Sequence, residues 1–464
     1  MTEQIVSRDG GASRPRFQRT RGLRRLPGAN GECDQHCGQA AGQAPEAGID
    51  HLVSELKNPS ARARITALQG LASAARPESA ATIAGALADP DDSVQQAAID
   101  ALLAIYTVHG DLSDRQWGPG SNGRTATRPE VAFEAGPLAT MPAPVPPEAL
   151  TGLASLVRGD ESLLTRLSAA YTLGTLGAPG MGPLPQAAAD RVGAELVAAL
   201  AHPDIATRQV VARIIGRVFA PVPGRPVPIA VGDAVIHAMN DPDPLVRRWA
   251  MDSLGWLRYE RAAPALTERF EFYRKGEEAA AALHALARIG SPDSAPILRA
   301  QLGSSSPSFR VIAIEGLGRI NDPDAAGDIA KATATPRNAS VALAAAFAQF
   351  LTGQSSDITA IAAGLSRPDT AVQARVYLAE IGERNPEALH ALLRSPDPWL
   401  RRGTVELIGV SRQPTQASVI EPMLHDNAAE VIEATSEALR RLRAYAAATP
   451  VLRGTSGRPD GVSK

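Results

Sequence analysis

Two cysteines and a histidine form the densest group of potential metal ligands in the chain. The segment CDQHC places Cys33, His36 and Cys37 near the N-terminus, and no other cysteine occurs. A structural zinc ion needs four ligands, usually from two such pairs, so a second chain would have to complete the site. The two thiols could alternatively act as a redox switch. We interpret the segment as part of a tail without a defined metal site.

The other residues that could do chemistry match no catalytic pattern. None of the eight histidines is followed directly by glutamate. The sequence also lacks the phosphate-binding loop G-x-x-x-x-G-K-[ST], the nucleophile elbow G-x-S-x-G and the zinc helix H-E-x-x-H. The residues therefore give no support to an enzymatic activity, and we predict no catalytic, cofactor-binding or metal-ligating site.

Arginine, tryptophan and aspartate concentrate in DPDPLVRRWAMDSLGWL, residues 241–257. A similar pattern recurs in NPSARARITALQGL (58–71), HPDIATRQVVARIIGRV (202–218) and SPDPWLRRGTVELIGV (395–410). From Arg208 onward, the equivalents of Arg247 return with a period of about 31 residues. The dense segment is therefore one unit of an internal repeat.

The repeat predicts pairs of amphipathic helices. After most reference residues, such as Arg247, a small residue follows at three positions and leucine or isoleucine at seven, so both lie on one helical face. The glycine that often comes next permits close approach of a neighbouring helix or starts the exit turn. Aspartates such as Asp241 or Asp243 can cap the helix, and Pro244 suits its first turn. Because one pair cannot bury its own apolar face, the pairs must stack into an all-α solenoid.

Helix pairs with the pattern D-P-x-x-x-V-R-x-x-A-x-x-A-L-G resemble HEAT repeats. The short period resembles the bacterial HEAT-like class first associated with phycobilisome lyases, and the resemblance covers roughly residues 49–443. It implies an alpha-alpha superhelix of about eleven or twelve pairs. The class contains scaffolds, lyase subunits and hydroxylases, so the fold implies no single function. The His-Glu pairs that hold a di-iron centre in HEAT-repeat hydroxylases are absent here.

A regular column of arginines marks the reference position of the repeat. The column could bind an acidic partner. Because it is so regular, we interpret it instead as a structural ladder, in which each arginine bonds to the aspartate or to a carbonyl at the turn of the next repeat. The arginines in question are Arg64, Arg166, Arg208, Arg247, Arg310 and Arg401.

Five positions after the reference, the residue varies and is mostly polar, as on a solvent-facing helix surface. In HEAT folds the second helix of each pair lines the concave face, so the resemblance places this column in the groove. Exposed tryptophan and arginine are typical interface anchors. The alternative is an ordinary solvated face with tryptophans tucked between helices. The predicted partner-binding residues are Arg213, Arg248, Trp249, Asp252, Trp256, His284, Glu315, Arg319, Trp399, Arg402 and Glu406.

Composition divides the chain into five parts. We predict a disordered basic arm at 1–48, repeats at 49–109, an insertion rich in proline and glycine at 110–148, repeats at 149–443 and a flexible tail at 444–464. The insertion lacks helical periodicity and is predicted to be a long loop or a disordered segment.

The charge balance excludes a general attraction to nucleic acid or to an anionic membrane. The formal net charge is −2, and no apolar run approaches the length needed to cross a membrane. Without a secretory signal or a disulfide framework, we expect a cytoplasmic protein, and the composition suggests a bacterial one.

Three functional hypotheses follow. The first is a non-enzymatic scaffold that binds a protein partner in its concave groove. The second, which rests on the family resemblance alone, is an accessory lyase-like protein that acts on a tetrapyrrole or another cofactor. The third is nucleic-acid binding through the arginine-rich N-terminal arm, which the slightly acidic remainder of the chain does not favour.

Overall fold

The computed structural model describes residues 46–107, 128–181, 184–222, 225–322, 325–333 and 338–448. The chain divides into two units, residues 1–44 and 45–464, and all described helices belong to the second unit. The CDQHC segment and the basic arm lie outside the described residues, so both interpretations stay predictions. No described helix is both long and apolar enough to span a bilayer.

The helices that carry the sequence repeat pack side by side in one layer, which we call the inner layer. Each contacts the next along the chain, and α4 packs directly on α7 although the insertion separates them in sequence. The inner helices are α2 (Ala61–Ala74), α4 (Asp92–Tyr106), α7 (Leu163–Leu176), α9 (Ile205–Val218), α11 (Pro244–Leu257), α13 (Gly276–Ile289), α15 (Pro307–Ile320), α17 (Ala339–Leu351), α19 (Ala371–Arg384), α20 (Pro398–Gly409) and α22 (Ala429–Ala448).

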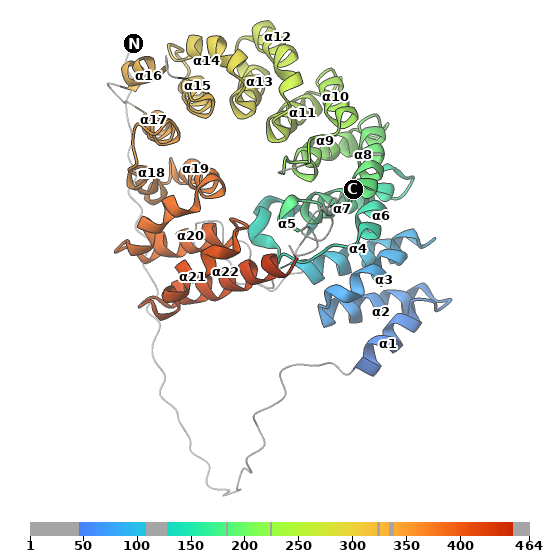
Figure 1. The fold of residues 1–464 in the computed structure, drawn as a ribbon. Coiled ribbons are helices and arrows are strands. Elements are labelled where there is room, and N and C mark those ends of the chain that lie inside the picture. The colour runs from blue at the N-terminus through green and yellow to red at the C-terminus, as the bar shows by residue number, and fades with distance from the viewer. Residues whose placement is uncertain are drawn as a thin grey trace, which may run out of the picture. The chain divides into compact units, whose positions relative to one another are not determined.

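The less regular helices form a second, outer layer. Figure 1 shows α10, α12 and α14 outside α11, α13 and α15 along the curved stack. The outer elements are α1 (Glu46–Glu55), α3 (Ala80–Gly85), α6 (Pro147–Arg158), α8 (Gln186–Ala199), α10 (Ile229–Ala238), α12 (Ala263–Tyr273), α14 (Ala295–Gln301), α16 (Ala325–Thr333), α18 (Thr359–Ala362), the 3-10 helix η8 (Pro386–Arg394) and α21 (Ala417–Ile420). The described chain is therefore an all-α solenoid of helix pairs, as the repeat predicted.

Side-chain caps begin most inner helices where the sequence placed them. Asp243 accepts hydrogen bonds from the backbone N–H groups of Leu245 and Val246, and Pro244 occupies the first turn of α11. Asp204 and Asp397 cap α9 and α20 in the same way. These caps satisfy N–H groups that have no partner inside the helix.

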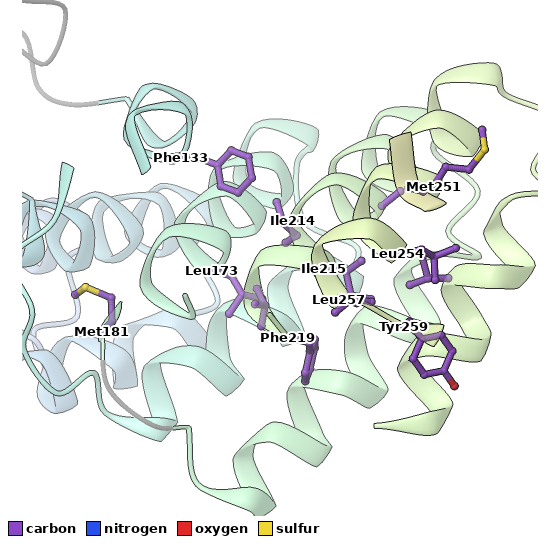
Figure 2. Close-up of a cluster of buried hydrophobic side chains, with 14 of the residues drawn as sticks. Phe133, Leu173, Met181, Ile214, Ile215, Phe219, Met251, Leu254, Leu257 and Tyr259 are labelled. Carbon is purple, nitrogen blue, oxygen red and sulfur yellow. The ribbon is translucent and has the colours of Figure 1, made fainter. Parts of the chain in front are cut away.

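Small residues set the spacing between the inner helices. The alanines three positions after the reference, such as Ala98, Ala250 and Ala313, are fully buried. A side-chain carbon on Gly318 would lie 2.7 Å from the Cα of Ala348 on the neighbouring helix, so the glycine column serves close approach rather than the exit turn. Figure 2 shows the larger apolar side chains of this core, among them Ile215 and Leu254.

The insertion contains a helix that the sequence did not indicate. Residues 129–135 form α5 (Pro129–Ala135), followed by the 3-10 turn η3 (Gly136–Ala139). Pro129 starts this helix and Gly136 ends it, but seven residues are too short to show a helical period. Residues 108–127 lie outside the description. At the other boundaries, α1 begins at Glu46 and α22 runs to Ala448, slightly beyond the predicted limits of the repeats.

The register of α19 also differs from the repeat alignment. Leu378 falls in the polar column when Gln373 is taken as the reference, yet it is buried, 1% exposed. Glu380, two residues later, is the side chain that reaches the neighbouring inner helices, where it binds Arg319. A register shift of this kind changes which side chains face the neighbouring helices, because each residue turns an α-helix by about 100°.

Candidate functional site

Four of the six reference arginines form the structural ladder predicted from their regularity, whereas Arg166 bonds to Thr207 of the next repeat and Arg310 bonds to the carbonyl of Ser304 in its own turn. Arg208 donates from Nε and Nη2 to the carboxylate of Asp241 at the next turn, at 2.8 and 3.2 Å. Its Nη1 donates to the carbonyls of His202 and Pro203 in its own turn, at 2.9 and 3.2 Å. Arg64, Arg247 and Arg401 repeat this arrangement with Asp89, Glu278 and Asp426. Hydrogen bonds within the solenoid already engage these four guanidinium groups, so they are not available to a partner.

The two aspartates of the Asp-Pro-Asp-Pro motif have different partners, and each contacts the preceding repeat. Asp241 accepts from Arg208 of the preceding repeat and from the N–H of Asp243. Asp243 caps α11 and also accepts from Gln209 Nε2 at 3.0 Å. Hydrogen bonds to the carboxylate and burial act on Asp243 in opposite senses, and the net effect is a lowered pKa.

The predicted column on α11 and α13 is partly recessed. Asp252 and His284 lie 3.8 Å apart between Oδ1 and Nδ1, and each side chain is about one third exposed. Burial raises the pKa of Asp252. Burial, together with the positive charges of Arg288 and Arg319, lowers the pKa of His284 well below its ordinary range. The imidazole is therefore neutral at pH 7, and its Nε2 can accept from Arg288 Nε at 3.5 Å.

The next inner helices bury two of the predicted site residues. Glu315 is 8% exposed and accepts a short hydrogen bond from the hydroxyl of Tyr377. Arg319, with a side chain 6% exposed, pairs with Glu380 at 2.9 Å and lies over the ring of Phe347. Burial and the nearby carboxylate of Glu315 raise the pKa of Tyr377. Glu315 and Arg319 thus hold α15 and α19 together and do not present a surface to a partner.

A cavity of about 340 Å³ lies beside this cluster. It opens among α13, α15, α17 and α19 and combines apolar walls with side chains that already have intramolecular partners, such as Asn338 and Gln373. Its lining is His284, Pro307, Ser308, Val311, Ile312, Glu315, Asn338, Ser340 and Gln373. In the described ranges, no group of three or more His, Cys, Asp or Glu side chains is arranged to hold a metal ion.

Two tryptophans of the predicted set are exposed, each beside an arginine. Trp256 on α11 is 46% exposed, and the guanidinium carbon of Arg288 lies 3.9 Å from its ring centre. Trp399 on α20 is 54% exposed and lies 5.6 Å from the guanidinium of Arg402, which also pairs with Glu406 at 3.0 Å. Each of these partly exposed aromatic rings therefore lies within cation–π distance of an arginine.

The remaining predicted residues already have partners within the solenoid. Arg248 pairs with Glu277 of the next repeat, and Trp249 packs against the core beneath Arg213, whose guanidinium lies 4.5 Å from its ring. Arg213 itself pairs with Glu134 of α5, so the insertion already occupies this part of the inner layer.

The sequence analysis selected Trp256 and Arg319 at the position nine residues after the reference but missed Arg217 and Arg288 there. Arg217, Arg288 and Arg319 all occupy this position, one helical turn after the polar column. Each makes a cation–π contact with a neighbouring aromatic ring. A repeated arginine one turn from a variable polar residue was the signal in the sequence.

Comparison with known proteins identifies the repeat. A family model described as HEAT repeats matches residues 49–113, 193–271 and 274–348. No curated protein matches the chain.

Several solved structures are similar to the chain. An engineered protein from a structural genomics consortium is 17% identical, over 85% of this chain and 99% of that one, with a TM-score of 0.37. The CpcE–CpcF complex of phycocyanin lyase from Nostoc sp. PCC7120 is 21% identical, over 54% and 94%, with a TM-score of 0.32. Importin beta is 16% identical, over 86% and 51%, with a TM-score of 0.33. What these proteins bind does not transfer to this chain at such values.

Proposed function

We propose that this chain, which matches the HEAT-repeat family model over residues 49–113, 193–271 and 274–348, is a non-enzymatic scaffold that binds a protein partner on its inner helices. HEAT solenoids are typical protein-interaction folds. The observation that carries the proposal is the pair of exposed tryptophans on inner helices, Trp256 and Trp399, each held beside an arginine.

The physical reason is the free energy of covering these rings. A tryptophan side chain buries roughly 150–250 Å² of surface, and about half of each ring here still faces solvent. Because each ring already contacts an arginine, fewer side-chain conformations are left to be lost when a partner covers it. Tryptophan and arginine are also the residue types that most often dominate protein interfaces.

The experiment is a quantitative capture with a matched control. The chain and its Trp256→Ala/Trp399→Ala variant are used to capture proteins from a cell lysate, and the bound proteins are quantified by mass spectrometry. Phe272→Ala removes an aromatic ring of the outer helix α12 that is 78% exposed, and serves as the control.

We expect a protein that binds the unchanged chain and the Phe272→Ala control but not the tryptophan variant. Its purified form should then bind with an affinity reduced by at least about tenfold in the variant, equivalent to 1.4 kcal/mol. Equal capture by all three chains, or loss only with Phe272→Ala, would remove the inner tryptophans from the binding surface.

A further inference from the structure

The helix α5 lies outside the series of helix pairs and rests on the inner layer. It packs against α7, while α4 and α7 contact each other without it and α3 packs on α6. Figure 2 shows Phe133 of α5 directed toward Ile214 of α9. The stack of repeats is therefore continuous without α5, and α5 is an added element on a surface that the repeats provide.

Phe133 is the apolar anchor of this contact. Its side chain is almost fully buried, 3% exposed, and its ring centre lies 5.6 Å from that of Tyr171 on α7. A side-chain carbon added to Gly174 would come within 2.8 Å of the Phe133 ring. The absence of a side chain at Gly174 therefore leaves the room that an aromatic ring needs.

Two arginines of α9 contact the backbone and the acidic side chain of α5. Arg217 donates to the backbone carbonyl of Phe133, and its guanidinium lies 3.8 Å from the centre of the same ring. Arg213 pairs with the carboxylate of Glu134 and stacks over Trp249. The surface thus recognises an aromatic residue, its carbonyl and the carboxylate that follows it.

The contact remains partial elsewhere. Glu134 keeps 41% of its side chain exposed, and Val131 is 42% exposed. Only Phe133 and Ala132 of α5 are buried. Two buried residues on a seven-residue helix form a small contact, while the residues that follow α5 are held separately by Arg441. The contact of α5 itself is therefore the part that is open to competition.

We propose that the α5-binding surface, made of Tyr171, Gly174, Arg213, Arg217 and Trp249, binds an aromatic–acidic segment of a protein partner, and that α5 is its internal competitor. The proposal rests on the proposed function, because it names the class of segment that the inner helices bind. A partner with a short helix carrying an aromatic residue followed by Glu or Asp binds by displacing α5.

Tethering sets the strength of this competition. A segment joined to its own binding surface acts at an effective concentration of about 1 mM or more, so a free segment of equal affinity competes poorly. Weakening the internal contact should therefore raise the affinity for the same segment supplied in solution.

The test uses the insertion's own sequence as the probe. A fluorescent peptide of residues 128–136, RPEVAFEAG, is titrated with the full chain and with its Phe133→Ala/Glu134→Arg variant, and binding is followed by anisotropy. Both substitutions lie in α5, so the receiving helices α7, α9 and α11 are unchanged. Circular dichroism verifies that the variant retains its helices.

We expect the variant to bind the peptide at least about tenfold more tightly than the unchanged chain. Equal binding by the two chains, or no binding by the variant up to about 1 mM peptide, overturns the proposal. Neither result affects the capture experiment on Trp256 and Trp399, so the two failures are distinguishable.

A charge reversal tests the recognition of the carboxylate. Adding Arg213→Glu to the variant should abolish binding of the peptide, and a peptide with Glu134→Arg should restore it. The control peptide carries Glu130→Arg, which reverses a charge that pairs only weakly with Arg128, at 3.8 Å, on the exposed part of α5. If the Glu134→Arg and Glu130→Arg peptides bind with the same affinity to the chains with and without Arg213→Glu, Arg213 does not recognise the carboxylate of Glu134. The proposed chemistry is then wrong.

Discussion

Replacing Arg208 with alanine removes one rung of the ladder between two repeats. The change deletes the two hydrogen bonds to Asp241 and the two to the carbonyls of His202 and Pro203. The side chains of Arg208 and Asp241 are only 12% and 10% exposed. Asp241 therefore loses its main counter-charge in a place where water replaces it only in part.

The expected cost lies between two limits. Removing one partner of a fully buried ion pair costs about 3–5 kcal/mol, and an exposed pair contributes about 0.2–1 kcal/mol. Because the pair lies at the turns, near the edge of the layer, we expect about 2 kcal/mol. Since each 1.4 kcal/mol is a factor of ten, local opening between α9 and α11 should increase roughly thirtyfold.

Hydrogen exchange measured by mass spectrometry resolves this opening helix by helix. In a stack of repeats, stability is local and passes through neighbouring interfaces, so α9 and α11 should exchange faster while α2 is unchanged. Arg261→Ala is the control, because Arg261 and Asp233 form a pair at 3.1 Å whose side chains are 61% and 44% exposed. That control should change exchange by less than about fivefold.

A double-mutant cycle completes the test. Arg208→Ala and Asp241→Ala together should cost less than the sum of the two single changes, with a coupling of about 1 kcal/mol or more. If Arg208→Ala accelerates exchange no more than Arg261→Ala does, or if the two changes are additive, the arginines do not join the repeats and the ladder interpretation fails.

Three further predictions concern single side chains. His284 has a lowered pKa among Asp252, Arg288 and Arg319, so the unfolded chain binds the extra proton below about pH 6.5 and stability falls as the pH drops. In urea titrations at pH 7.0 and 5.5, His284→Asn should reduce the loss of unfolding free energy between the two pH values. An equal loss in both chains would contradict the lowered pKa of His284. Gly216→Ala should lower the free energy of unfolding in urea by about 1–3 kcal/mol, because the new carbon would lie 2.7 Å from the Cα of Ser253. The control Gly85→Ala, whose new carbon meets nothing within 4 Å, should leave stability unchanged or raise it by about 0.5 kcal/mol. Equal effects of the two changes would refute close approach at Gly216. Arg441→Met should accelerate hydrogen exchange in α22, because the buried guanidinium donates to the carbonyls of Pro137, Leu138 and Thr140. The control is Arg440→Met, at an exposed position. An equal acceleration of exchange in both variants would refute that role of Arg441.

The local parts of the architecture could be predicted from the residues. Asp243 and Pro244 begin α11 through contacts within four residues, and the repeat period predicts the buried face of most inner helices, with α19 as an exception. The ladder was predictable for the same reason: an arginine that recurs in register with an acidic residue meets it in most copies, as Arg208 meets Asp241.

The candidate site was predicted less completely. Trp256 and Trp399 are exposed as expected, but Glu315 and Arg319 are buried in an ion-pair network with Glu380. The sequence analysis placed Trp256, Trp399, Glu315 and Arg319 together on one recognition surface and did not select Glu380. Whether a polar side chain on that surface meets solvent or an opposite charge depends on the neighbouring helices, and a register shift such as that of α19 changes which side chains those helices present.

The sequence by itself determined the helix pairs, their caps and their stacking, because these depend on spacings that repeat along the chain. Only the tertiary structure decided that α5 covers Arg213 and that Arg441 of α22 binds the carbonyls that follow α5, across about 300 positions of sequence. Contacts of that kind follow no period. They form where a curved stack brings distant segments together and a buried guanidinium must find acceptors.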